Sequence, residues 1–176
     1  MRMTKLIAAA GTILLAFGVT AGPAAAVAPA SIQPTGVHAT VTKLSNADAT
    51  SRLRNAGITW SSSGGCSDRN NPTCTSFEQV NLSTIQGIIT LKSASGCAIN
   101  ITGGTETGHA SGTYSHWNGY KLDISHNSCI DGYIHSAFTR IGNRGDGFPQ
   151  WQSGAGNIYC DEGSHWDITF YNCGGC

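Results

Sequence analysis

The chain has 176 residues, with ten basic and ten acidic side chains, and only 11% of its residues are charged. A near-neutral chain without a basic patch gives no indication of nucleic-acid binding. The length suits one domain with its own core, and 23 glycines are typical of a loop-rich extracellular domain.

The N-terminus, residues 1–28, has the pattern of a secretory signal peptide. Arg2 and Lys5 precede an apolar run over residues 6–19, and small residues follow up to Ala28. We expect cleavage near residue 28 and secretion of the remainder, which carries eight basic and ten acidic side chains. A membrane anchor is the weaker alternative, because a bilayer-spanning helix needs about 20 apolar residues. No later segment approaches that length.

The mature chain divides into two predicted parts. Residues 29–49 have no clear period and are expected to form an extended lead-in. Residues 50–176 are expected to form a single domain. There is no internal repeat, so we predict one core.

Two helices are predicted in the first half. Ser45 or Asn46 can cap a short helix at the end of the lead-in. A second helix is expected to begin at Thr75, because Thr75 and Glu78 have capping-box spacing, and to continue towards Gly96.

Two strands are predicted next, over residues 97–102 and 120–125, where apolar and polar residues alternate. In the second strand Lys121, Asp123 and Ser125 share one face, and the apolar residues supply the buried face. Asp123 can therefore point away from the core.

The clearest helix spans residues 128–142, with apolar residues at helical spacing and Gly142 as its stop. A glycine-rich loop, residues 142–156, leads to two closing strands at 157–160 and 166–171. Together these elements predict an α+β domain with a small antiparallel sheet and flanking helices.

Seven cysteines follow the signal peptide, and an oxidising compartment would pair most of them. We predict that Cys66 pairs with Cys74 across a short loop, and that Cys160 pairs with Cys173 or Cys176. Zinc binding by cysteine is a weaker alternative, because the Cys-x-x-Cys pair at the C-terminus is not matched by a second one.

Two spaced motifs supply candidate zinc ligands. Hydrolytic zinc needs three protein ligands, an open position for water and a nearby carboxylate. His116 and Asp123 form a His-x6-Asp motif, and Glu162 and His165 form a later Glu-x-x-His motif. A bend between Glu162 and His165 would bring both to one side, and Asp167 could then orient the imidazole of His165.

These motifs resemble those of the D-alanyl-D-alanine metallopeptidases of bacterial cell-wall metabolism, which share their zinc fold with hedgehog signalling domains. The resemblance covers roughly residues 50–176. It implies that His116, Asp123 and His165 bind Zn²⁺ and that Glu162 is the general base. It also implies a secreted zinc metallopeptidase with peptidoglycan as its substrate, and we expect a monomer.

One segment departs from the family pattern. Family members usually present an arginine ahead of the first ligand to hold a substrate carboxylate, whereas this chain has Thr105 and Glu106 there. We interpret both as substrate-binding residues, together with His109, which could instead be an auxiliary metal residue. A carboxylate at Glu106 would repel a terminal carboxylate, so we expect an internal bond, or one beside a free amine, to be preferred.

The remaining histidines and two arginines have weaker assignments. His126 and His135 are interpreted as structural or solvent-facing, and His38 has no assigned role. Arg140 or Arg144 could restore a carboxylate clamp from another direction.

Each motif also has a purely structural interpretation. His116 and Asp123 could be a hydrogen-bonded pair, while Glu162 could be solvated and His165 packed. The function could then be that of a secreted, metal-stabilised binding protein. A disulfide-rich carbohydrate-binding module is a further alternative, which would use exposed aromatic residues such as Trp60, Trp117 and Trp151. A serine nucleophile lacks its Gly-x-Ser-x-Gly elbow, and a cysteine nucleophile would need a reduced thiol.

Overall fold

The computed structural model describes residues 41–176. The predicted signal peptide, most of the predicted lead-in and His38 lie outside the described residues. Within residues 41–176 there are three helices, α1 (Asn46–Asn55), α2 (Leu82–Ser95) and α3 (Ser128–Ala137). The strands are β1 (Lys43–Leu44), β2 (Thr59–Trp60), β3 (Val80–Asn81), β4 (Asn100–Gly103), β5 (Lys121–Ser125), β6 (Thr139–Ile141), β7 (Gln150–Gln152), β8 (Ile158–Asp161) and β9 (His165–Thr169).

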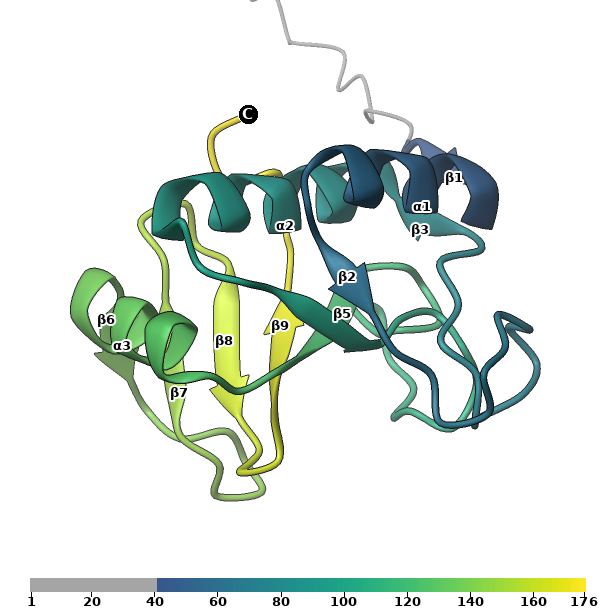
Figure 1. The fold of residues 1–176 in the computed structure, drawn as a ribbon. Coiled ribbons are helices and arrows are strands. Elements are labelled where there is room, and N and C mark those ends of the chain that lie inside the picture. Colours follow the sequence, from purple (N-terminus) through teal and green to yellow (C-terminus); the bar gives the residue numbers. More distant parts are fainter. Residues whose placement is uncertain (1–40) are drawn as a thin grey trace, which may run out of the picture. The chain divides into compact units, whose positions relative to one another are not determined.

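Seven strands form one sheet in the order β2-β4-β5-β9-β8-β7-β6. Only β2 and β4 pair in parallel among these described strands, and the other neighbours are antiparallel. Strands β1 and β3 form a separate antiparallel pair. Helices α1 and α2 lie side by side along one side of the sheet (Figure 1). The predicted α+β class with a mostly antiparallel sheet is confirmed.

The first helix has the predicted cap. The Ser45 hydroxyl accepts a hydrogen bond from the Asp48 N–H at 3.1 Å, which satisfies one free donor of the first turn. Strand β1 and the first turn of α1 lie before residue 50, where the domain was predicted to begin. Helix α2 ends, as predicted, at Gly96, whose φ of 67° suits a left-handed C-cap.

The second helix begins later than predicted, at Leu82 rather than Thr75. The expected capping box does not form, because the Glu78 carboxylate accepts a hydrogen bond from the Asn46 N–H at the start of α1. Gln79, with a φ of 63°, then interrupts any continuous helix. Local spacing could not predict this competition, since the partner of Glu78 is distant in sequence.

The third helix ends at Ala137 and not at Gly142. Phe138 adopts an extended conformation and packs against Tyr159, with ring centroids 4.6 Å apart. Residues 139–141 then form β6, which pairs with β7 inside the predicted glycine-rich loop. The helix was predicted to be too long because Phe138 and Ile141, which lie after α3, also fall at helical spacing.

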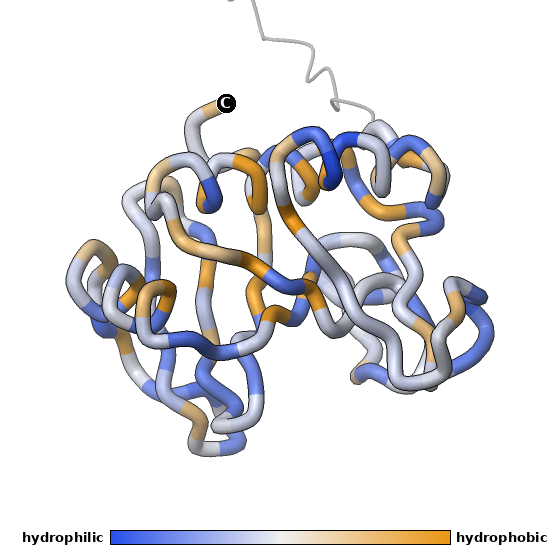
Figure 2. Tube along the Cα trace, viewed as in Figure 1, coloured by the Kyte–Doolittle hydropathy of each residue, from blue (hydrophilic) through white to orange (hydrophobic). Residues whose placement is uncertain are grey.

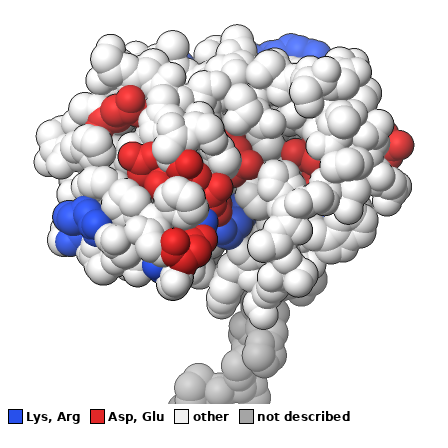
Figure 3. Space-filling model, turned by 90° about the horizontal axis from the view of Figure 1, so that it is seen from below, with Lys and Arg blue, Asp and Glu red and all other residues white. Residues whose placement is uncertain are grey.

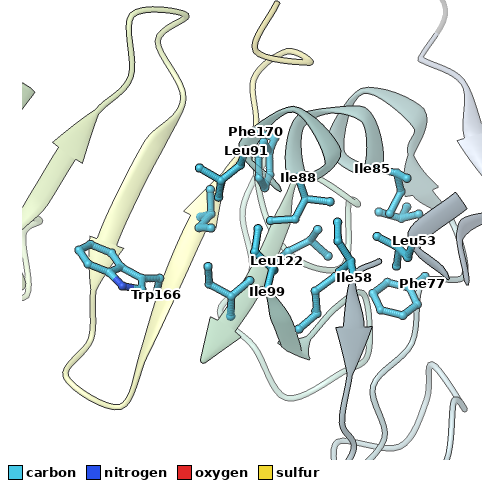
Figure 4. Close-up of a cluster of buried hydrophobic side chains, with 14 of the residues drawn as sticks. Leu53, Ile58, Phe77, Ile85, Ile88, Leu91, Ile99, Leu122, Trp166 and Phe170 are labelled. Carbon is cyan, nitrogen blue, oxygen red and sulfur yellow. The ribbon is translucent and has the colours of Figure 1, made fainter. Parts of the chain in front are cut away.

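The core lies between the helices and one face of the sheet. Figure 4 shows Leu53, Ile88 and Leu122 directed into this layer from α1, α2 and β5, and all three are fully buried. Figure 2 shows hydrophobic residues along the helices and central strands, with hydrophilic loops at the lower end. A Cβ at Gly87 would overlap the ring of Phe170, so glycine permits the close approach of α2 to the end of the sheet.

Three disulfides join six of the seven cysteines, in pairs that differ in part from expectation. They are Cys66–Cys74, Cys97–Cys129 and Cys173–Cys176. The first pair was predicted. The prediction for Cys160 was wrong: it is free and buried, because Cys173 pairs with its near neighbour Cys176. Burial raises the pKa of the Cys160 thiol to about 11, which keeps it protonated and unreactive near neutrality.

Three disulfides fit an extracellular or otherwise oxidising environment. Among residues 41–176, no helix has the length and apolar character needed to cross a membrane.

Candidate metal centre

The candidate site lies on the face of the sheet opposite the core. In β5 the side chain of Leu122 enters the core, and Asp123 points to a cavity on the other face, as strand alternation predicted. In β9 the same alternation buries Trp166 and directs Asp167 to the cavity. Asp123 and Asp167 are direct cross-strand partners.

Two carboxylates lie opposite one another in a buried position. Asp123 and Asp167 are each 6% exposed. Like charges directly opposite one another destabilise a sheet, and a buried polar atom without a partner is costly. The Oδ1 atoms of Asp123 and Asp167 are nevertheless buried without a hydrogen-bond partner. On the other side of Asp123, a Cβ at Gly103 would overlap the carboxylate, so glycine provides its space.

His116 is held with one ring nitrogen directed at Asp123. Its Nδ1 lies 2.7 Å from the carbonyl oxygen of Gly104, which can only accept, so Nδ1 carries a proton and donates it to this hydrogen bond. Nε2 lies 3.2 Å from Asp123 Oδ1. Burial alone would lower the pKa of His116, but Asp123, Asp167 and the Gly104 carbonyl together raise it above its usual value.

Glu162 and His165 flank the tight turn that joins β8 to β9. The Glu162 N–H donates to the His165 carbonyl at 3.0 Å, and Gly163 has a φ of 79°, which suits the turn. The predicted bend is therefore present, and it brings Glu162 Oε2 within 3.2 Å of His165 Nε2. His165 Nε2 also lies 3.7 Å from Asp123 Oδ1, and its Nδ1 lies 2.9 Å from the Ser164 hydroxyl.

Thr105 and Glu106 do not line this cavity, and their interpretation as substrate-binding residues stays a prediction. The Glu106 carboxylate accepts hydrogen bonds from the N–H groups of Gly104 and Ser76 and lies 3.1 Å from His109 Nε2. The Thr105 hydroxyl donates to the Ser76 carbonyl at 3.1 Å. Burial acts to raise the pKa of Glu106, but His109 and the two backbone N–H groups outweigh it and hold the pKa below its usual value.

His109 does lie at the site. Its Nδ1 is 3.8 Å from Asp123 Oδ2, and its ring stacks on His116 with centroids 3.8 Å apart and planes 15° from parallel. Donor atoms of His109, His116 and Asp123 lie within 4.8 Å of one another and form a candidate metal-binding group. The structure thus places three imidazoles around one carboxylate, with His165 as the third.

Asp167 does not orient His165, so that prediction is corrected. Its Oδ2 accepts hydrogen bonds from Lys121 Nζ at 2.6 Å and from Arg144 Nη1 at 3.0 Å. Its unpaired Oδ1 lies 3.8 Å from His116 Nε2. Asp167 therefore belongs to the surroundings of His116, because cross-strand pairing places it beside Asp123.

The cavity has a volume of about 410 Å³ and is strongly charged. Its cations are Lys121 and Arg144, and both are already paired with carboxylates. Its carboxylates are Asp123, Asp146, Glu162 and Asp167. Figure 3 shows acidic side chains gathered on this side of the molecule, with basic side chains among them.

Arg144 was considered in the sequence only as a possible carboxylate clamp. Its guanidinium contacts Glu162 Oε1 at 2.6 Å and Asp146 at 2.7 Å, and these carboxylates raise its pKa. Arg140 instead lies over the ring of Trp151, outside the cavity. The sequence did not predict the contact of Arg144 with Glu162, because this contact depends on the conformation of the loop after β6.

The other two described histidines lie outside the cavity, in agreement with their structural interpretation. His126 Nδ1 lies 2.9 Å from Asp131, and the ring of His135 packs against Trp151 at 4.6 Å.

The comparisons with known proteins found no match for this chain. No family model matches it, and no curated protein or solved structure is significantly similar to it. The fold and the site therefore define only a class, a small disulfide-containing α+β domain with a candidate metal centre of histidine and aspartate.

Proposed function

We propose that this protein is a secreted zinc metallopeptidase that hydrolyses a peptide bond in the stem or cross-link peptides of peptidoglycan, with the hedgehog-like zinc fold of the family it resembles. The observation that carries the proposal is the unpaired, buried Oδ1 of Asp123, which faces the Nε2 atoms of His116 and His165. A divalent cation bound there would satisfy the carboxylate and both imidazoles.

The donor set fits zinc. Two imidazoles and one carboxylate, with a fourth position left for water, are a common ligand set for catalytic zinc. A ligating histidine usually has its second nitrogen fixed by a hydrogen bond. Here Gly104 fixes His116 and Ser164 contacts His165.

His165 is preferred over His109 as the third ligand. A metal lies in the plane of the imidazole that binds it, about 2.0 to 2.1 Å from the nitrogen. The rings of His109 and His116 stack in nearly parallel planes, with centroids 3.8 Å apart, so in this arrangement one ion cannot lie in the plane of both rings. Distance alone groups His109 with His116 and Asp123, but this orientation favours His165.

Zinc in this site would lower the pKa of water to about 7 and polarise the scissile carbonyl. Glu162 is placed to accept the proton of that water and to deliver it to the leaving amine. Arg144 holds Glu162 Oε1 and leaves Oε2 directed towards His165, so the base has a fixed orientation. Lys121 and Arg144 neutralise Asp167 beside the ligands.

The charge of the cavity bears on the substrate. Neither cation is free to bind a terminal carboxylate, since Lys121 and Arg144 are both held by acidic side chains. We therefore still expect cleavage of an internal peptide bond, or of one beside a free amine. The reason is now that Arg144 is already paired with carboxylates, and no longer the charge of Glu106. A free-carboxylate wall pentapeptide should be cleaved more slowly than its C-terminal amide or cross-linked muropeptides.

The test is digestion of purified peptidoglycan by the secreted chain, with and without a chelator, followed by readdition of zinc. New peptide termini that appear only with metal, and that Glu162→Gln suppresses, support the proposal. A zinc-bound protein without turnover on peptidoglycan, whose melting temperature falls on chelation, would instead identify the metal-stabilised binding protein.

A further inference from the structure

A second cavity, of about 250 Å³, adjoins the candidate metal cavity. Gly108 and His109 line both, so the two cavities have a common wall. Trp117, which directly follows His116, lines the second cavity and not the candidate metal cavity. A ligand held in this second cavity would therefore lie next to the metal ligands.

The indole of Trp117 is exposed yet held in place. The side chain is 45% exposed, the guanidinium of Arg69 lies over its ring at 3.7 Å, and Arg69 also donates to the Trp117 carbonyl. Arg69 Nε donates to the Thr105 carbonyl at 3.2 Å, and the Cys66–Cys74 disulfide closes the loop that carries Arg69. An exposed aromatic ring that is already fixed loses little conformational freedom when a ligand stacks on it.

Apart from Trp117, the shared His109 and the buried Glu106, the lining residues are glycines and residues with hydroxyl or amide side chains, and most of the surface that lines the cavity is apolar. The oxygens of Glu106 are already engaged by two backbone N–H groups and His109. No Leu, Ile, Val or Met side chain lines the cavity. The hydroxyl and amide side chains are those of Thr107, Ser111, Ser115 and Asn118.

We propose that this cavity, with Trp117 as its stacking surface, is a subsite for a neutral pyranose of the glycan strand to which the wall peptide is attached. A pyranose combines hydroxyl groups with an apolar face of C–H groups, which matches an indole beside uncharged hydrogen-bonding side chains. A charged side chain of the peptide would find no free counter-ion there. The choice of a glycan ligand rests on the proposed function. The sugar is assigned to a cavity that none of the three proposed zinc ligands, His116, Asp123 and His165, lines.

Binding of peptide-free N-acetylglucosamine oligomers to the full secreted chain with its metal tests the subsite directly. We expect saturable binding by calorimetry or NMR titration, weakened at least tenfold in Trp117→Ala and less in Trp117→Phe. Tyr114→Ala is the matched control, because Tyr114 is 48% exposed on the same loop but does not line the cavity, and it should bind as the unaltered chain does. Metal content and far-ultraviolet circular dichroism of each variant check the fold.

Three outcomes would overturn the subsite. The first two are no binding of the oligomers by the unaltered chain, and equal binding by Trp117→Ala with its fold intact. A third is protection of Trp117 by sugar-free stem peptide and not by the oligomers. In a second arm, Trp117→Ala should lower the ratio of kcat/KM for glycan-linked over glycan-free peptide. Because oligomer binding requires no turnover, sugar binding without peptidase activity refutes the proposed function alone, and peptidase activity without sugar binding refutes the subsite alone.

Discussion

The two halves of the candidate centre differ in how firmly the fold holds them. The side chains of His116 and Asp123 are 5% and 9% exposed, between the sheet and the loop before β5. Those of His165 and Glu162 are 26% and 24% exposed, on a hairpin turn. In the buried half, the Asp123 Oδ1 atom lies 3.2 Å from His116 Nε2 and is shielded from solvent. The hairpin half is more open to solvent, and Arg144 holds its Glu162.

The largest expected effect is on Asp123. Asp123→Ala should weaken zinc binding by more than 100-fold, since removal of an outer partner alone typically costs 10- to 100-fold. Competition with a chromophoric chelator measures the affinity. Asp48→Asn, which removes one carboxylate at the start of α1, is the control and should bind zinc normally. Equal affinity of the two variants would mean that the buried half does not bind the metal.

The next effect separates His165 from His109. His165→Ala should also lower zinc affinity by more than 100-fold, whereas His109→Ala should lower it by about tenfold or less, as expected of an outer residue. The same competition assay compares the two variants. The reverse order would assign the third ligand to His109 and leave the hairpin without a metal role.

Glu162→Gln should separate metal binding from turnover. The hairpin should still hold zinc, while turnover of wall peptide should fall by about 10²-fold or more, as for a general base. Zinc content and the release of new amino termini are measured on the same preparation. Undiminished turnover would remove Glu162 from the mechanism, and loss of zinc would make it a ligand.

The smallest expected effect concerns Glu106, behind the buried half. Its pKa is lowered in the folded chain, so its contribution to stability is present above its ordinary pKa of about 4.5 and is lost as pH falls through the folded value. In chelator-treated protein, the free energy of unfolding should therefore fall less between pH 6 and pH 3 in Glu106→Gln than in the unaltered chain. Urea unfolding at both pH values measures this, and identical losses would show that Glu106 is not stabilised by its buried hydrogen bonds.

The sequence predicted features that depend on neighbours along the chain. Strand alternation placed Asp123 on the face away from the core, and Ser45 was found as the cap of α1. It failed where a partner is distant. The Glu78 carboxylate accepts a hydrogen bond from the first turn of α1 and does not cap α2. The Glu106 carboxylate accepts a hydrogen bond from the backbone N–H of Ser76.

The cysteines and the cavity follow the same rule. Cys66 and Cys74 flank one short loop and were paired correctly, whereas Cys97 and Cys129 come together only through the packing of the elements between them. The pairing of Lys121 and Arg144 with Asp167 likewise depends on cross-strand register and on a loop conformation. Such contacts cannot be read from spacing.

The central claim is that His116, Asp123 and His165 hold one zinc ion. A crystal structure of the zinc-loaded chain, with anomalous diffraction at the zinc edge, tests it most directly. We predict one anomalous peak in contact with Nε2 of His116, a carboxylate oxygen of Asp123 and Nε2 of His165, with His109 still stacked on His116. A peak held by His109 in place of His165, or no peak at this site in zinc-saturated crystals, would contradict it.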